Sequence, residues 1–134
     1  MTTDAKIAIV EAQIEAWNTK NWKAAGDMFA EDAVLHSMMI EPVAGREQIS
    51  QRIAALGAGT EEITLDVRNI GRVGDVVFVE RVDRFIYNGH KGAVPVVGVL
   101  EIEGDKITAW REYYDRAMLI REMGLSEDFH KSGA

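Results

Sequence analysis

The dominant spacing of hydrophobic residues along this chain changes close to residue 60. Before that point apolar side chains recur at helical intervals, as Ile7, Val10, Ile14 and Trp17 do. After it apolar and polar residues alternate, which is typical of strands. An order of helices first and an antiparallel meander second predicts the α+β class. The long strands are expected to twist strongly and to curl the sheet around the helices packed on one of its faces.

Capping residues mark where the first two helices begin. Thr3 or Asp4 precedes the first helix, and Asn21 precedes a short second helix that we expect to include Met28 and Phe29. The other elements of this half are expected to be a short strand over 33–38, a loop over 42–45 and a third helix that ends at 57–59.

Turn residues divide the second half into strands, expected over 63–70, 76–87, 92–103 and 106–115. Asn88 and Gly89 are typical of a type I′ hairpin turn, whose two central residues need positive φ. A short helix over 117–123 and a polar tail over about 125–134 follow. A chain of 134 residues predicts a single domain over 1–134.

Composition excludes several classes of function. The net charge of −7 argues against nucleic acids and anionic membranes as partners, because both attract basic surfaces. The chain has no cysteine for disulfides or thiol chemistry, and we expect a cytoplasmic location. Its first residues lack the basic flank and apolar core of a signal peptide, and no apolar run approaches the roughly 18 residues of a membrane span. No acidic and histidine residues show metal-ligand spacing, so we expect no metal, and the chain contains no phosphate loop or dinucleotide-binding fingerprint.

Two opposite charges interrupt the longest apolar strand. Arg81 and Asp83 lie two residues apart, so they share one face of the strand with Val77 and Val79. The opposite face is also mixed, and alternation alone leaves open which face is buried. If the pair points inward, each charge needs a partner. If it points outward, it is an ordinary surface ion pair.

A second carboxylate, Asp115, closes the last strand. An arginine between two acids would supply the groups needed for acid–base chemistry on a small molecule. Asp115 lies an even number of positions from Arg111 and Tyr113, so within a strand the three would share one face. An aspartate at the end of a strand is also a common cap of the following helix, and both roles stay open.

Three stretches of the second half together resemble the limonene-1,2-epoxide hydrolase family: 80–83, 97–102 and 110–115. Upstream positions that are similar too are 29–33, Pro42 and 45–47. The resemblance implies a cone-shaped, strongly curved mixed sheet with helices in its concavity, the fold of nuclear transport factor 2 and ketosteroid isomerase. It also implies a homodimer and a reaction that needs no cofactor.

The same resemblance implies the roles of three residues. Asp115 would be the base that activates water, Asp83 would give a proton to the epoxide oxygen, and Arg81 would bridge the two carboxylates. Water would attack a small apolar epoxide directly, without a covalent ester, to give a vicinal diol. Replacement of Asp115 by asparagine would then abolish diol formation.

The sequence departs from the family at the positions that hold the attacking water. The family has a tyrosine and an asparagine there, and this chain has Leu35 and Ser37. Serine can still form a hydrogen bond, whereas leucine cannot. A register shifted by one residue would place His36 in the pocket instead.

Two other functions fit the same residues. An isomerase or a polyketide cyclase of the same fold could use the acidic pocket with an aspartate base. A ligand-binding dimer without catalytic activity is the third possibility, because a fold does not determine a function.

Overall fold

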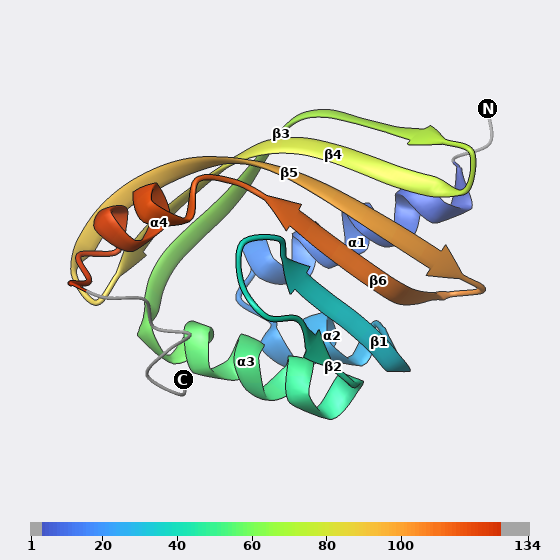
Figure 1. Ribbon diagram of the computed structural model, residues 1–134, viewed down its shortest axis with the longest axis horizontal. Coiled ribbons are helices and arrows are strands. Elements are labelled where there is room, and N and C mark those ends of the chain that lie inside the picture. Colours follow the sequence, from blue (N-terminus) through green and yellow to red (C-terminus); the bar gives the residue numbers. More distant parts are fainter. Residues whose placement is uncertain (1–3, 127–134) are drawn as a thin grey trace.

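The computed structural model describes residues 4–126, which form four helices and one six-stranded sheet (Figure 1). The helices are α1 (Ala5–Asn18), α2 (Trp22–Asp27), α3 (Arg46–Gly59) and α4 (Arg116–Glu122). The strands are β1 (Phe29–Ser37), β2 (Val43–Ala44), β3 (Thr60–Val73), β4 (Val76–Tyr87), β5 (His90–Glu103) and β6 (Lys106–Tyr113). Thr3 and most of the expected tail lie outside the described residues.

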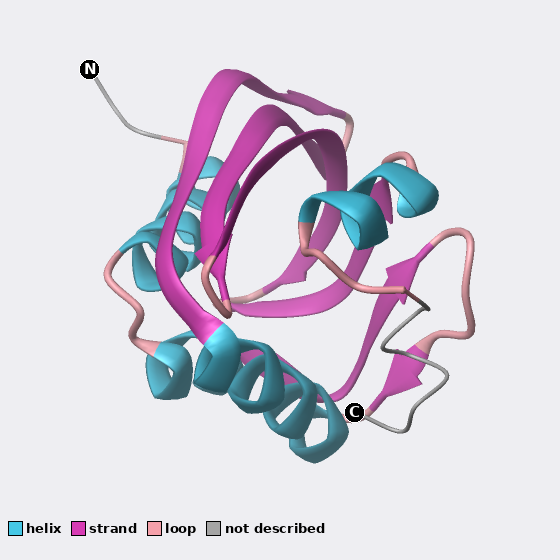
Figure 2. Ribbon diagram, turned by 90° about the vertical axis from the view of Figure 1, so that its left-hand side faces the viewer, coloured by secondary structure: helices cyan, strands magenta, loops and turns pink. Residues whose placement is uncertain are grey.

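The sheet is mixed and strongly curved, as expected. Its strand order is β2-β1-β6-β5-β4-β3, with β1 parallel to β6 and every other pair antiparallel. Figure 2 shows the long strands bending around the molecule, with the helices of the first half along one side. The short helix α4 packs on β5 near the open end of this curve. The β1–β6 pair brings the beginning and the end of the sheet together.

The expected helix caps are present, and one helix is shorter than predicted. The carboxylate of Asp4 accepts hydrogen bonds from the backbone of Lys6 and Ile7, and Asn21 caps α2 through Ala24. Helix α2 ends at Asp27, so the prediction that it includes Phe29 is wrong. Phe29 begins β1 because its fully buried ring stacks on Trp110, and this packing outweighs local helix propensity.

The ends of α3 and β6 differ from the prediction, because each is followed closely by another element. Helix α3 continues through 57–59 and leads straight into β3 at Thr60, without a left-handed glycine to end it. The hairpin turn is confirmed, with φ of 45° at Asn88 and 84° at Gly89. Strand β6 ends at Tyr113, two residues early, because Asp115 caps α4.

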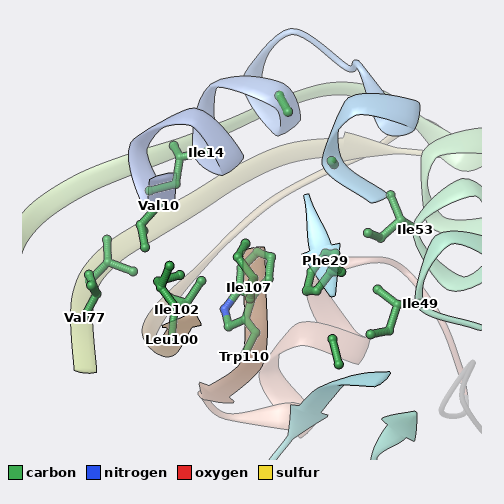
Figure 3. Packing of buried hydrophobic residues seen from close by; sticks show 14 of the residues in the cluster. Val10, Ile14, Phe29, Ile49, Ile53, Val77, Leu100, Ile102, Ile107 and Trp110 are labelled. Atoms are coloured by element: carbon green, nitrogen blue, oxygen red, sulfur yellow. The ribbon is translucent and has the colours of Figure 1, made fainter. Parts of the chain in front are cut away.

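The larger of two hydrophobic clusters fills the space between the helices and the concave face of the sheet. Figure 3 shows side chains from α1 and α3 pointing toward Leu100, Ile107 and Trp110 of the strands. Trp110 lies at the centre, stacked on Phe29 at 6.0 Å and edge-on to Trp17 at 6.4 Å. Beyond Trp110, toward α4, the interior opens into a cavity.

Candidate active site

Arg81 and Asp83 point into the concave side of the sheet. Val77, Val79 and Phe85 on the same face of β4 are buried, and the Arg81 side chain is only 3% exposed. The inward alternative is therefore the correct one. A guanidinium this deeply buried must be surrounded by acceptors and compensating charge.

Two carboxylates satisfy the Arg81 guanidinium. Asp83 accepts from Nε through Oδ1 at 2.7 Å and from Nη2 through Oδ2 at 3.1 Å. Glu112 of β6 accepts from Nη1 through Oε2 at 3.1 Å and from Nη2 through Oε1. Arg81 thus holds two carboxylates, one on each side of its planar head, in paired hydrogen bonds.

Asp115 is not part of this cluster. Its carboxylate accepts from the backbone N–H of Met118 at 3.0 Å and is exposed to solvent. The prediction that Arg81 bridges Asp83 and Asp115 is therefore wrong in its second partner, which is Glu112. The physical reason is strand alternation: Asp115 has the parity of Arg111 and Tyr113, which lie on the outer face. The capping role that the sequence left open is the one observed.

Glu112 is the residue that sequence reasoning missed. It lies within the stretch that carried the family resemblance, three residues before Asp115, the residue expected to be the base. The available signal was its parity with Trp110, because the largest apolar residue of a strand usually marks the buried face. In the structure Trp110, Glu112 and then Tyr114 all line the cavity.

Leu35 and Ser37 also line the cavity, as expected. The parallel register pairs Leu35 with Trp110 and Ser37 with Glu112. Ser37 is therefore the strand neighbour of the newly identified carboxylate. His36 has the opposite parity and does not line the cavity. Its Nε2 lies 2.9 Å from the carbonyl oxygen of Ile40.

The cavity has a volume of about 170 Å³ and mostly apolar walls. Strands β3 to β5, together with α1 and α4, contribute the apolar residues Trp17, Ile63, Leu65, Phe85, Val94, Val96, Leu119 and Met123. Arg81, Asp83 and Glu112 contribute charge to the wall of this space, as do Glu41, Arg52 and Arg116. Such a site suits a small apolar molecule that carries one reactive polar group.

Burial changes how the cluster binds protons. Loss of solvent raises the pKa of Glu112, and Arg81 offsets only part of this effect. Burial disfavours the charged form of Arg81, but the charges of Glu112 and Asp83 outweigh it and raise the arginine pKa, so Arg81 stays cationic. The raised pKa lets Glu112 accept a proton more readily than an exposed carboxylate does.

Small and aromatic residues of β5 and β6 enclose the cluster. A Cβ on Gly98 would lie 2.8 Å from both Arg81 Nη1 and Glu112 Oε2, so only glycine leaves room for them. The Arg81 guanidinium lies 5.8 Å from the centre of the Trp110 ring. The buried Trp110 Nε1–H lies beside Glu112 without a well-aligned hydrogen bond. Its proximity offsets a small part of the effect of burial, which still raises the Glu112 pKa.

Two further features concern ligands and membranes. Within residues 4–126, no three acidic, histidine or cysteine side chains come close enough together to hold a metal ion. None of the helices in this part of the chain is both long and apolar enough to cross a lipid bilayer.

Comparison with known proteins identifies relatives over most of the chain. The SnoaL-like domain family model matches residues 10–110. Epoxide hydrolase EphG of Mycobacterium tuberculosis is 26% identical over 106 residues, which are 79% of this chain and 70% of that protein.

Solved structures agree with the architecture. A hypothetical protein with a ketosteroid isomerase-like fold from Catenulispora acidiphila, in complex with trimethylamine, has a TM-score of 0.77 at 32% identity, covering 87% of this chain and 92% of that chain. An epoxide hydrolase of the limonene-1,2-epoxide hydrolase type from M. tuberculosis has a TM-score of 0.79 at 22% identity, covering 89% of each. Structures described as putative polyketide cyclases also share the fold. The fold is thus α+β and of the nuclear transport factor 2 type.

Proposed function

The chain belongs to the SnoaL-like domain family, and we propose that it is a cofactor-independent epoxide hydrolase in which Glu112 and Asp83 are the acid–base pair. The observation that carries this proposal is the Asp83–Arg81–Glu112 cluster at the side of an apolar cavity. The similarity to epoxide hydrolase EphG supports the same reaction class.

The proposed reaction opens the epoxide in one step. A water oxygen attacks one epoxide carbon while Glu112 takes a proton from that water. The bond between carbon and the epoxide oxygen breaks as Asp83 gives its proton to that oxygen, and the product is a vicinal diol. Proton transfer from Glu112 back to Asp83, through solvent or along the Arg81 bridge, completes the cycle. Positioned acid–base groups of this kind accelerate reactions by about 10²- to 10⁴-fold.

Two observations support Glu112 as the base. Its strand neighbour Ser37 lies on the same wall of the cavity, so one water can contact both side chains. Burial also raises the Glu112 pKa, and a carboxylate with a raised pKa is a stronger base near neutral pH. Asp83, on the other side of Arg81, is then the proton donor.

The matched variants Glu112→Gln and Asp115→Asn test this assignment. We expect Glu112→Gln to lower diol formation by about 10²- to 10⁴-fold, and Asp115→Asn to leave it near the wild-type rate because asparagine also caps helices. Diol formed from a panel of small apolar epoxides would be measured. Loss of activity in Asp115→Asn with retention in Glu112→Gln would reverse the assignment.

Isotope-labelled water separates direct attack from a covalent route. In a single turnover, the label should enter the diol at once. Label in a carboxylate of Asp83 or Glu112 would instead indicate a protein ester and contradict direct attack by water.

A second candidate is an isomerase or polyketide cyclase that uses the same buried carboxylates. Leu35 favours it, because this side chain faces the cavity and cannot hold a water. Such an enzyme would exchange a proton next to a ketone with deuterated solvent. Exchange without any diol formation from epoxides would favour this candidate.

We also propose that two copies of the chain pair through the outer face of the sheet. Phe78, Val97 and Tyr113 lie on this face with 40%, 37% and 45% of their surface exposed. Val97 and Tyr113 are direct cross-strand neighbours. Light scattering after gel filtration should show a dimer for the native chain and a monomer for Val97→Asp. A monomeric native chain would contradict the proposal.

A further inference from the structure

A chain of hydrogen bonds reaches the cavity from outside the acid–arginine cluster. The Arg116 Nη1 donates to the Tyr114 hydroxyl at 2.5 Å, and this hydroxyl donates to Ser37 Oγ at 3.1 Å. All three residues line the cavity. They come from three parts of the fold: β1, the segment after β6 and the first turn of α4.

We propose that Tyr114, held by Arg116, is a positioning residue that turns the Ser37 hydroxyl toward the attacking water. This inference rests on the proposed epoxide hydrolase function and extends it to Tyr114 and Arg116, to which the sequence analysis gave no role. The Tyr114 hydroxyl would thus take over a role that Leu35, which has no hydroxyl, cannot fill.

The direction of the chain follows from the donors available. Arginine has no acceptor, so Arg116 must donate to the Tyr114 oxygen. The single proton of the tyrosine hydroxyl is then free to point to Ser37 Oγ. The proton of Ser37 must in turn point away from Tyr114, because that contact already uses a lone pair of its oxygen.

The next polar group along the cavity wall is Glu112. It pairs with Ser37 across the parallel β1–β6 register, and neighbouring strands are about 4.8 Å apart. A water between them would accept the Ser37 proton and donate one of its own to Glu112. Arg81 already occupies one lone pair on each Glu112 oxygen, which leaves further sites for this water. The second lone pair of the water faces the cavity, where the substrate lies.

The position of Arg116 is itself fixed by local structure. Arg116 is the first residue of α4, directly after the cap Asp115. Its guanidinium also lies 6.0 Å from the centre of the Tyr114 ring. Helix α4 therefore presents the arginine to the tyrosine, and the cap of that helix contributes to the site indirectly.

Removal of single hydroxyls tests the role of the chain. We expect Tyr114→Phe and Ser37→Ala each to lower kcat by about tenfold, with little change in KM, because an oriented water affects the transition state rather than substrate binding. Ser37→Thr keeps the hydroxyl and should retain most of the activity. The control is Thr64→Val, an exposed hydroxyl of β3 that does not line the cavity, and it should leave kcat within about twofold of the native value.

The double variant distinguishes one chain from two separate contributions. Because Tyr114 is proposed to act through Ser37, Tyr114→Phe combined with Ser37→Ala should be no slower than Ser37→Ala alone. Multiplied losses, or an unchanged kcat in Tyr114→Phe, would overturn the inference. If those results occurred while Glu112→Gln was inactive, the proposed hydrolase function would stand without this positioning role.

A crystal structure tests the geometry without any assay of activity. At a resolution that shows ordered waters, the native protein should hold a water within hydrogen-bond distance of Ser37 Oγ and the Glu112 carboxylate. In Tyr114→Phe this water should be displaced or less occupied. A native cavity without that water, or an identical water in Tyr114→Phe, would overturn the inference even if the substrate were not an epoxide.

Discussion

Two consecutive residues of β6 form ion pairs on opposite faces of the same sheet. Arg111 contacts Glu101 on the outer face at 2.5 Å, where the two side chains are 29% and 48% exposed. Glu112 contacts Arg81 on the inner face, where the side chains are 13% and 3% exposed. Water and salt screen the outer pair, and it contributes little. The inner pair is dehydrated, so its pKa values change and the loss of one partner is costly. The face of the sheet on which each pair lies therefore decides whether it is exposed or buried.

The largest contrast is expected from removal of each arginine. Arg81→Leu leaves two buried carboxylates without their cation and should lower the free energy of unfolding by about 3–5 kcal/mol. The matched change Arg111→Leu should cost about 0–1 kcal/mol. Urea denaturation followed by circular dichroism measures both. Similar costs for the two variants would mean that the faces do not differ as described.

A methyl group added against the cluster, compared with one added away from it, gives the next largest contrast. Gly98→Ala places a Cβ against Arg81 and Glu112 and should cost about 1–3 kcal/mol, together with most of the activity. At Gly71 a Cβ would meet nothing within 4 Å, so Gly71→Ala should change stability by about 0.5 kcal/mol or less. An active and fully stable Gly98→Ala protein would show that the cluster tolerates displacement.

Asp115, the exposed carboxylate after β6, is expected to act only as the cap of α4. Asp115→Ala removes the hydrogen bond to the Met118 N–H and should lower stability by about 0.5–2 kcal/mol. Asp115→Asn keeps a capping side chain and should cost less. Thermal melts of the two variants provide the measurement. Equal losses in both would indicate that the charge of Asp115 matters beyond capping.

The smallest effect is a gradual change of stability with pH. Burial raises the Glu112 pKa above its ordinary value of 4.5, so the folded chain keeps this proton to higher pH than the unfolded chain. The contribution of Glu112 to the free energy of unfolding should therefore fall as pH rises from about 4.5 through the raised pKa, and then level off. Denaturation series at several pH values should show a smaller decline in Glu112→Gln. An unchanged decline would mean that Glu112 is not the group responsible.

Local chemistry made much of the fold predictable from sequence. Asp4, Asn21 and the Asn88–Gly89 turn act through their own neighbours, and all three are present as predicted. The second half was predicted well because turns separate its strands. Phe29 was assigned to the wrong element because its partner, Trp110, is distant in sequence. Residue patterns alone also gave no sign of the parallel β1–β6 pair, and the mixed sheet was expected only from the family resemblance.

The candidate site was predictable in part. Arg81 and Asp83 stood out because charges are rare within an apolar strand, while Leu35 and Ser37 were located by the resemblance. The third charged residue was placed three positions too late, because both Glu112 and Asp115 are acidic and only their facing distinguishes them. Facing depends on how β6 packs, and the bulge between Glu101 and Ile102 interrupts simple alternation nearby. The hydrogen bond from Tyr114 to Ser37 could not be predicted, because it joins parts of the chain 77 positions apart.

The parallel contact between β1 and β6 also sets the order in which the site can assemble. Arg81 and Asp83 lie in a hairpin that closes through a tight local turn, a fast event. Ser37 must wait for β6, whose docking closes a much longer loop and is correspondingly slower. During synthesis, a nascent chain that stops before Lys106 already contains the arginine and its first acid but exposes them to water. The completed pocket is therefore a late product of folding, because it needs contacts of β6 with strands on both of its sides.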